Sequence, residues 1–221
     1  MWMSFRPAIP PGTYSTIYNF DKELEHNMEF SDILKQRRSI RRFKQQEIPL
    51  SILTDLIDAA AVAPSGANNQ PLRYVLIREK ELLKAVFEQT AWGGHVRPRR
   101  DPEFGVTSPT AFLAVCAADQ GNQTPTPAAA VDAGAAIQSI LFRAVDLGLG
   151  ACWIGAFNRR NVNELLRLDG LTAIYLVGLG YPAETPVLQR IRMGDSTKYF
   201  LDEQDVIHVP KYTVNDILSI R

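Results

Sequence analysis

A concentration of cationic side chains is the most distinctive chemical feature of the sequence. In KQRRSIRRFK, residues 35–44, six of the ten residues are lysine or arginine, and Ser39 adds a hydroxyl. Arginine forms bidentate hydrogen bonds with phosphate oxygens and serine donates a further one, so the segment suits a phosphate dianion. On composition alone, a solvated basic face or a nucleic-acid patch is the commoner origin of such a run. Ile40 and Phe43 favour the phosphate site, because their apolar side chains indicate that the segment lies against a core.

A second group of polar side chains lies in APSGANNQP, residues 63–71. Ser65, Asn68, Asn69 and Gln70 offer hydrogen-bond donors and acceptors within a short span, and Gly66 permits unusual backbone angles. Such mixed polar groups suit the edge of a flat heteroaromatic ring that carries carbonyls and ring nitrogens. An ordinary polar turn has the same composition.

A third candidate segment is LGLGACWIGAFN, residues 147–158. Gly155 and Ala156 follow an expected strand, and their small side chains let backbone N–H groups approach a planar ligand closely. A backbone N–H donor of this kind can tune hydride transfer at a flavin ring. The alternative is a tight turn between a strand and a helix.

Composition narrows the possible functions. The 221-residue chain carries 24 basic and 24 acidic residues, and 46% of its residues are hydrophobic. A balanced chain has no global field for nucleic acid or an anionic membrane, so an anion site must be built locally. The N-terminus lacks the apolar region of a signal peptide, and the apolar stretch of residues 128–149 contains charges. We therefore expect a cytoplasmic protein without membrane or nucleic-acid partners.

Motifs for other chemistries are missing from the sequence. Cys116 and Cys152 lie in apolar runs and are expected to be reduced core thiols, and the three histidines are scattered without metal-ligand spacing. No GxGxxG, GxxxxGK[ST] or GxSxG motif occurs. We therefore expect no metal site, no dinucleotide site of the Rossmann type and no catalytic residue that acts as a nucleophile or general base.

The elements that must position these segments follow from hydrophobic periodicity and turn signals. Helices are expected at about 28–36, from Pro49 to Pro64, at 79–89 and at 128–147, and another helix is expected to be capped by Asn161. Strands are expected at 73–77, 110–118, 151–154 and 172–180, the last turning at GYP, followed by a hairpin of YFL and VIHV. Helices and strands alternate, which favours an α/β or α+β domain in three layers.

In this order, the motifs resemble those of the nitroreductase family of FMN enzymes. They are RRSIRRF, APSGANNQP, AAIQSILFRAVDLGLGACWIGAF and GLGYPAE, and the resemblance spans about Phe30 to Glu184. It implies an α+β fold in which helices flank a mixed β-sheet, assembled as an intertwined homodimer. A single FMN-binding domain would occupy residues 28–221, after an arm of residues 1–27, with a C-terminal extension from about residue 185.

The resemblance also assigns site residues by position. Those expected to hold the FMN phosphate and ribityl chain are Arg37, Arg38, Ser39 and Arg41, and Arg41 is also a candidate for the N1/O2 edge of the ring. Those of the loop that reaches FMN, partly across the dimer interface, are Pro64, Ser65, Gly66, Asn68 and Gln70. The residues expected under the flavin ring and near its N5 atom are Ile154, Gly155 and Ala156. A late basic residue on the phosphate is expected among Arg190, Arg192 and Lys211.

The implied activity is ping-pong hydride transfer from NAD(P)H to FMN and on to a small acceptor, namely a nitroaromatic, a quinone or an activated alkene. In the irregular stretch 90–109, Trp92 and His95 would shape access of the acceptor. Its arginines, Arg97, Arg99 and Arg100, would favour an anionic substrate or the NADPH phosphate, unless the loop is merely solvated.

Other activities remain open at this stage. APSGA also resembles the deiodinase-like branch of the same fold, so reductive dehalogenation, oxidation of a peptide heterocycle and flavin breakdown are alternatives. A non-catalytic FMN-binding protein is another alternative, and a nucleic-acid module that uses residues 35–44 is a third.

Overall fold

A five-stranded sheet forms the centre of the molecule. The computed structural model describes residues 28–96, 100–121, 123 and 125–221, so the expected N-terminal arm of residues 1–27 lies outside the described part of the chain. The strand order is β1-β5-β3-β2, and β4 also pairs with β5. The strands are β1 (Phe43–Lys44), β2 (Arg73–Ile77), β3 (Ala111–Ala118), β4 (Gly150–Ile154) and β5 (Leu171–Pro182).

Strand β3 shows why this sheet needs helices on both faces. Seven of its eight residues are buried. Because successive side chains of a strand point to opposite faces, Leu113 and Val115 pack into one apolar cluster, while Phe112 and Ala114 pack into the other. A strand buried on both faces reads as a continuous apolar run.

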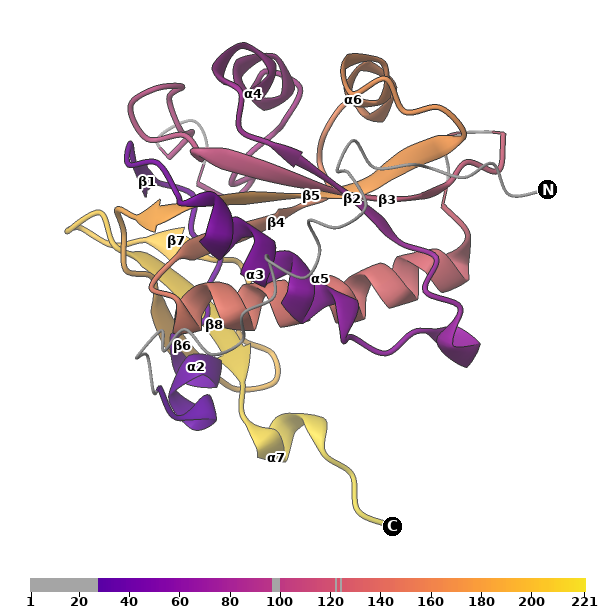
Figure 1. Ribbon diagram of the computed structural model, residues 1–221. Helices are drawn as coiled ribbons and strands as arrows, with labels where there is room; N and C mark the ends of the chain where they lie inside the picture. Colours follow the sequence, from indigo (N-terminus) through magenta and orange to yellow (C-terminus); the bar gives the residue numbers. More distant parts are fainter. Residues whose placement is uncertain (1–27, 97–99, 122, 124) are drawn as a thin grey trace.

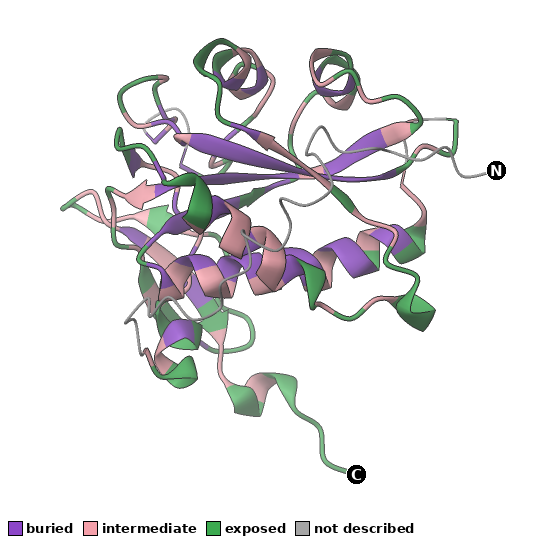
Figure 2. Ribbon diagram, in the orientation of Figure 1, coloured by how far each residue is buried: buried purple, intermediate pink, exposed green. Residues whose placement is uncertain are grey.

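The helices cover both faces of the sheet (Figure 1). On one face lie α4 (Lys80–Phe87) and α6 (Arg159–Leu165), and on the other lie α3 (Leu50–Ala61) and α5 (Pro127–Asp146). The buried residues concentrate between these layers (Figure 2). This arrangement confirms the expected three-layer α+β fold.

Helix α5 lies in the core of this arrangement. By length and composition it is apolar enough to cross a membrane, and the same is true of many core helices. Ala133, Ile137, Ile140 and Ala144 are fully buried and belong to the cluster that α3 and the sheet share. The short helix α2 (Phe30–Gln36) packs near the C-terminal end of α5, where the rings of Phe30 and Phe142 meet edge to face.

A second, smaller sheet follows the main one in sequence. It has the order β6-β8-β7, with β6 (Val187–Ile191), β7 (Phe200–Leu201) and β8 (Ile207–Tyr212), and we call it the C-terminal sheet. The β7–β8 pair is antiparallel and confirms the expected hairpin. Strand β6, which pairs in parallel with β8, has no counterpart among the expected elements. The chain ends after helix α7 (Val214–Ile217).

Two local expectations were wrong. Helix α6 is capped by Asn158, whose Oδ1 accepts a hydrogen bond from the backbone N–H of Asn161, so Asn161 lies inside the helix. The expected turn at GYP is absent, because β5 continues through Tyr181 and Pro182 and pairs there with β1. The second error has a tertiary cause, since only a strand distant in sequence satisfies the backbone groups of these residues.

Candidate functional site

The basic segment, residues 35–44, leaves α2 and runs along the edge of the sheet. Its burial alternates: Arg38 and Ile40 are buried, whereas Arg37, Ser39 and Arg41 are half-buried. Ser39 forms a parallel bridge with Ala151, so this part of the segment is strand-like. Alternation in an extended chain therefore separates the cations, with Arg38 on the side opposite to Arg37 and Arg41.

Two glycines of the sheet let the segment lie this close. A Cβ on Gly150 would be 2.9 Å from side-chain atoms of Ile40, and a Cβ on Gly180 would be 2.8 Å from the Phe43 ring. The Ile40 backbone N–H also donates to the Ala151 carbonyl at 3.0 Å. The apolar residues of the segment thus lie against the core, as expected from the sequence.

Glu184 fixes the other end of the segment. Its Oε1 accepts hydrogen bonds from the backbone N–H groups of Arg41 at 2.5 Å and Arg42 at 3.2 Å. Its Oε2 lies 3.8 Å from Nη1 of Arg100, and the two side chains are 4% and 8% exposed. Arg100 also contacts Asp205 of the C-terminal sheet through an ion pair and a hydrogen bond to its carbonyl. This buried network joins the basic segment, the stretch 90–109 and the C-terminal sheet.

A cavity of about 470 Å³, which we call the basic pocket, opens between the basic segment and the C-terminal sheet. The parallel register of β6 and β8 places Arg190 directly beside Lys211. The lining residues are Leu34, Lys35, Arg38, Leu188, Arg190, Lys211, Tyr212 and Ile217. No acidic side chain is among these described residues, so the pocket is strongly cationic.

The electrostatics of the basic pocket suit an anion. Burial lowers the pKa of the Arg38 guanidinium, and the neighbouring charges of Arg37 and Arg190 lower it further. The Nε of Arg38 is buried without a hydrogen-bond partner, and only 8% of this residue is exposed. Like charges that face one another across strands destabilise a fold, and a buried unsatisfied donor costs about 1–3 kcal/mol. A bound phosphate would relieve both penalties.

A second cavity of about 260 Å³, which we call the aromatic pocket, lies beside the end of β4. Arg41 supplies its charge, Trp92 and Trp153 supply apolar walls, and the exposed backbone of Gly155 and Ala156 forms part of its surface. The complete lining is Arg41, Ala91, Trp92, Gly93, Gly94, Cys152, Trp153, Ile154, Gly155, Ala156 and Tyr199. Such a cavity fits a flat ring with a partly negative edge.

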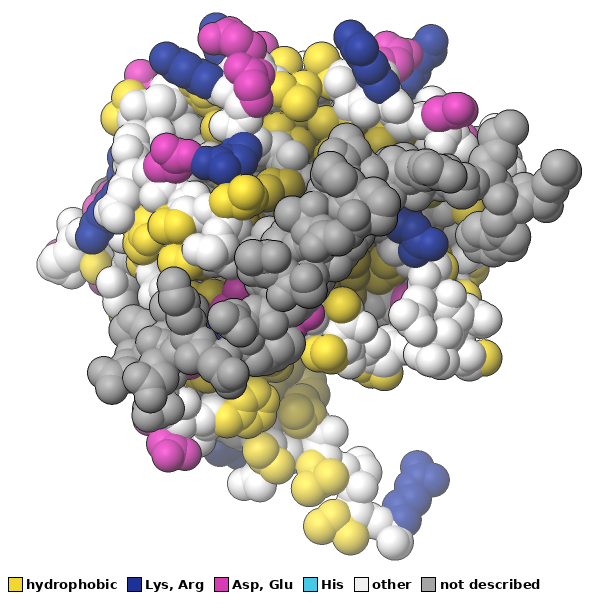
Figure 3. All heavy atoms as spheres, in the orientation of Figure 1, with side chains coloured by type: hydrophobic (Ala, Val, Ile, Leu, Met, Phe, Trp, Pro, Cys, Tyr) yellow, Lys and Arg dark blue, Asp and Glu magenta, His cyan; other side chains and the backbone are white. Residues whose placement is uncertain are grey.

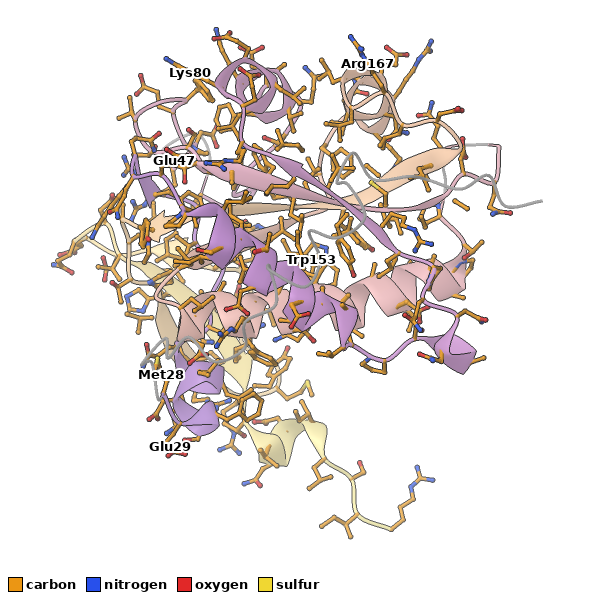
Figure 4. All side chains as sticks on the ribbon, viewed as in Figure 1. Met28, Glu29, Glu47, Lys80, Trp153 and Arg167 are labelled. Carbon is orange, nitrogen blue, oxygen red and sulfur yellow. The ribbon has the colours of Figure 1, made fainter. Side chains whose placement is uncertain are left out.

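The tryptophans of the aromatic pocket are fixed by their neighbours. Trp92 is buried, and its Nε1 donates to Oγ1 of Thr90 at 2.7 Å. Trp153 lies between the sheet layer and α5 (Figure 4), edge to face with Tyr175, and a Cβ on Gly134 of α5 would be 3.6 Å from it. Rigid apolar walls of this kind orient a ring without polar bonds.

Tyr199, immediately before β7, closes the aromatic pocket from the C-terminal sheet. The guanidinium carbon of Arg41 lies 4.8 Å from the centre of the Tyr199 ring. The ring of His95 meets the same ring edge to face at 4.8 Å, and the His95 backbone N–H donates to the Tyr199 hydroxyl at 3.3 Å. His95 therefore contacts a wall of the pocket and is not itself among the lining residues.

Among the described residues, no histidine or acidic side chain lines either pocket. Cys116 and Cys152 are free and buried, and burial raises the pKa of their thiols to about 12 and about 11. Both are thus unreactive thiols at neutral pH. Within the described residues, no group of three His, Cys, Asp or Glu side chains could hold a metal ion.

No residue of the polar loop, residues 63–71, lines either pocket. The Gly66 backbone N–H donates to Oδ1 of Asp132 at 3.0 Å, near the start of α5, whereas Phe142 near its end contacts α2. These two positions are ten residues apart, which corresponds to about 15 Å of helix. Within one chain, the loop and the basic segment therefore lie at opposite ends of α5.

The backbone of the polar loop is strained where the sequence does not reveal it. Ala67, Asn68 and Gln70 have φ values of 49°, 55° and 47°, whereas Gly66 does not have a positive φ. The expectation that Gly66 takes the unusual angles was therefore wrong. Pro64, Gly66, Asn68 and Gln70 are exposed, and Ser65 accepts a hydrogen bond from the Gln70 backbone N–H. Strain on an exposed loop is typical of a binding segment.

The structure divides the expected site residues into groups. Arg38, Arg190 and Lys211 meet in the basic pocket, and Arg41, Trp92 and residues 154–156 meet in the aromatic pocket. Arg37 and Ser39 lie on the connecting segment and line neither. Arg192 also lines neither; its side chain is exposed and pairs with Asp216 at 3.4 Å.

One of the three arginines of the stretch 90–109 differs from the expectation. Arg100 is buried in its network with Glu184 and Asp205, so it does not face an acceptor. Arg97 and Arg99 lie outside the described residues. Sequence reasoning assigned no role to Tyr199, Glu184 and Trp153. Trp153 lies inside GACWIGAF and Glu184 ends GLGYPAE, so their motifs were a signal, whereas Tyr199 lies in no motif of the site.

Comparisons with known proteins place this geometry in a family context. The sequence model of the nitroreductase family matches residues 34–181. A candidate NADH dehydrogenase/NAD(P)H nitroreductase of Methanothermobacter thermautotrophicus is 28% identical over 169 residues, which are 72% of this chain and 80% of that protein. An iodotyrosine deiodinase of Haliscomenobacter hydrossis is 31% identical over 89 residues, which are 40% of this chain and 39% of that protein.

Among solved structures, a candidate nitroreductase of Desulfovibrio desulfuricans in complex with FMN is similar over most of the chain. The TM-score is 0.59 and the identity 26%, and the match covers 75% of this chain and 93% of that one. The similarity therefore extends beyond short motifs to the whole three-layer fold.

Proposed function

Because the chain belongs to the nitroreductase family, we propose that it binds FMN across the basic pocket and the aromatic pocket and transfers hydride from NAD(P)H to a small organic acceptor. It is an FMN-dependent oxidoreductase, as the family, the NAD(P)H nitroreductase relative and the FMN-bound structural neighbour indicate. The choice of acceptor and the details of transfer belong to the proposal.

One observation carries the assignment of FMN to these pockets. Arg38 lines the basic pocket and Arg41 lines the aromatic pocket, and three residues of chain span at most about 10 Å. FMN has a dianionic phosphate at one end and a flat ring at the other, joined by a flexible ribityl chain. The opposite characters of the two pockets match the two ends of this molecule, and the ribityl chain would pass from one side of the basic segment to the other, because Arg38 and Arg41 lie on opposite sides of it.

The residues present fit the two ends of FMN. Arg38, Arg190 and Lys211 would hold the phosphate, with the unpartnered Nε of Arg38 as one donor. The backbone of Gly155 and Ala156 would approach the ring, and Arg41 would lie at the ring edge where negative charge collects on reduction. When bound, FMN supplies the hydride chemistry for which the described side chains offer no acid, base or nucleophile.

The acceptor would be a small organic molecule such as a nitroaromatic, a quinone or an activated alkene. Gly155 and Ala156 are exposed, so the aromatic pocket is open to a second flat molecule at the ring. Reductive dehalogenation is a second candidate, because 89 residues of the chain are 31% identical to an iodotyrosine deiodinase.

The site would be completed by a second copy of the chain. The strained polar loop lines neither pocket of its own chain and lies at the end of α5 opposite to the basic segment. Exposed apolar side chains follow α7 near the C-terminus (Figure 3). Val214, Ile217, Leu218 and Ile220 each expose more than half of their surface. An intertwined homodimer would bury these residues and bring the loop to the partner's site.

The phosphate assignment is tested by FMN affinity. Arg190→Ala and Lys211→Ala each remove a charge-assisted hydrogen bond worth about 1.5–3 kcal/mol, so each should weaken FMN binding roughly ten- to hundredfold. Arg192→Ala is the matched control, because Arg192 is a neighbouring arginine that pairs with Asp216 outside both pockets. Equal affinity in all four proteins, measured by flavin fluorescence titration, would show that the phosphate binds elsewhere.

The activity is tested by anaerobic reduction of the purified holoprotein. NADH or NADPH should bleach the flavin absorbance, and an acceptor should restore it. A panel of nitroaromatics, quinones, activated alkenes and halogenated phenols distinguishes the candidate acceptors. A flavin that binds tightly and is reduced by neither nucleotide would indicate a non-catalytic FMN-binding protein.

A further inference from the structure

The contact between Arg41 and Tyr199 is not explained by the assignment of FMN to the two pockets. Arg41 belongs to the basic segment, whereas Tyr199 lies immediately before β7 of the C-terminal sheet, 158 residues later in the chain. An arginine that lies over an aromatic face is held by its planar guanidinium, and such contacts contribute about 0.5–2 kcal/mol. The only hydrogen bond that the described residues offer to the Arg41 guanidinium is a long one, from Nη1 to the Ser39 carbonyl at 3.5 Å. The Tyr199 ring is therefore its principal support.

Tyr199 is itself held from several sides. The His95 ring packs against it, and its hydroxyl accepts a hydrogen bond from the His95 backbone. The next residue, Phe200, pairs with His208 in the β7–β8 ladder. The C-terminal sheet is in turn fixed to the core by the buried contacts of Arg100 with Asp205 and Glu184. The ring is thus a rigid surface and not a loose side chain.

We propose that Tyr199 is a positioning residue for Arg41: its ring holds the guanidinium at the edge of the flavin where negative charge collects on reduction. Through this contact the C-terminal sheet influences the reduction potential of the bound flavin. This inference rests on the proposed binding of FMN in the aromatic pocket. A fixed positive charge at this edge stabilises the reduced cofactor more than the oxidised one. A guanidinium without its aromatic support would sample other rotamers and lose part of this effect.

The experiment compares the reduction potential of bound FMN in four holoproteins. Tyr199→Ala removes the ring and should shift the potential to a more negative value, with FMN affinity about three- to tenfold weaker. Tyr199→Phe keeps the ring and should retain the wild-type potential. Phe200→Ala is the matched control, because it removes the adjacent aromatic ring of the same sheet, which stacks on His208 outside the aromatic pocket; it should also retain the wild-type potential.

A double variant shows whether the effect passes through Arg41. Tyr199→Ala should add no further shift in an Arg41→Gln background. A wild-type potential in Tyr199→Ala, an equal shift in Phe200→Ala or Tyr199→Phe, or an additive shift in the double variant would each overturn the positioning role. These outcomes leave FMN binding by the wild-type protein intact, whereas a wild-type protein that binds no FMN would overturn the proposed function and this inference together.

Discussion

At the scale of single residues, the site depends on a few buried charges that have more than one role. Glu184 accepts hydrogen bonds from the backbone N–H groups of two arginines of the basic segment and also faces Arg100. A carboxylate at this position therefore fixes both the direction of the segment and the attachment of the C-terminal sheet. Charges of this kind are expensive to bury and are expected where they organise a site.

We expect Glu184→Ala to reduce the free energy of unfolding by roughly 3 kcal/mol, because it leaves two backbone donors unsatisfied and weakens a buried ion pair. Glu184→Gln keeps the side-chain volume and an acceptor for the backbone, so its loss should be roughly half as large. Urea denaturation of the two variants measures the difference. Equal losses would show that the carboxylate charge matters more than its hydrogen bonds to the backbone.

A second prediction concerns Asp202, whose Oδ1 accepts the backbone N–H groups of Val206 at 2.8 Å and Gln204 at 3.0 Å. The hydrogen bond from Val206 is the first cause that lowers the pKa of Asp202 below its ordinary value of 3.8, followed by the bond with His208. A lowered pKa in the folded state means that the carboxylate stabilises the turn above pH 3.8, and that this contribution is lost as the pH falls through the lowered pKa.

We therefore expect acidification below about pH 4 to loosen the turn of residues 202–206. The protection of the Val206 amide against hydrogen exchange, measured relative to the intrinsic exchange rate at each pH, should fall over this range in the wild-type protein. In Asp202→Asn, exchange at Val206 should be faster at neutral pH and should lack this acid-dependent step. Persistence of the acid step in the variant would assign it to another carboxylate.

At the scale of secondary-structure elements, helix termini and strand ends determine where the site segments begin. Residues 154–156 line the aromatic pocket, and helix α6 starts shortly after them. Its N-cap Asn158 therefore limits how far residues 154–156 can move. The continuation of β5 through Pro182 has a similar effect, because it gives β1 a partner and holds Phe43 over Gly180.

We expect Asn158→Ala to destabilise the protein by about 1 kcal/mol, the usual cost of losing an N-cap. Asn161→Ala is the control, since its side chain makes only an exposed hydrogen bond to Gln89, at 2.8 Å, and should cost less than about 0.5 kcal/mol. Thermal or urea unfolding distinguishes the two variants. A larger effect at Asn161 would contradict the assigned cap.

At the scale of the whole molecule, the arrangement of the three layers separates two segments that the family resemblance assigns to one site. The polar loop is anchored at Asp132 and the basic segment follows α2, which packs near Phe142. This separation supports the proposal that two chains form a complete site, each of which would give its loop to the other.

We expect the protein to sediment as a dimer and to show complementation between two defective variants. One carries Arg190→Ala and Lys211→Ala, and the other carries Ser65→Ala, Asn68→Ala and Gln70→Ala in the loop. Each variant alone should hold little FMN, whereas a mixed dimer contains one intact site and should hold about one FMN per dimer. A mixed dimer as empty as its parents would place the loop and the pockets in separate functions.

The sequence by itself determined the elements and the chemistry of the segments. Periodicity located the core helices and strands to within a few residues, because the burial of one face is a local property of the chain. Composition located the six cations of residues 35–44, and the apolar Ile40 and Phe43 among them favoured an anion site against the core over a solvated face. Two of the three expected segments, residues 35–44 and 147–158, contribute residues to the pockets, whereas the role of residues 63–71 stays a prediction.

Only the tertiary structure decided which residues meet. The parallel register of β6 and β8 brings Arg190 beside Lys211 in the basic pocket. Arg192 lies beyond the paired residues and pairs with Asp216 outside that pocket. The buried contacts of Arg100 attach the C-terminal sheet so that Tyr199 reaches Arg41. Such pairings join positions that are far apart in the chain, and their energy comes from burial and from satisfied backbone groups, neither of which leaves a local pattern in the sequence.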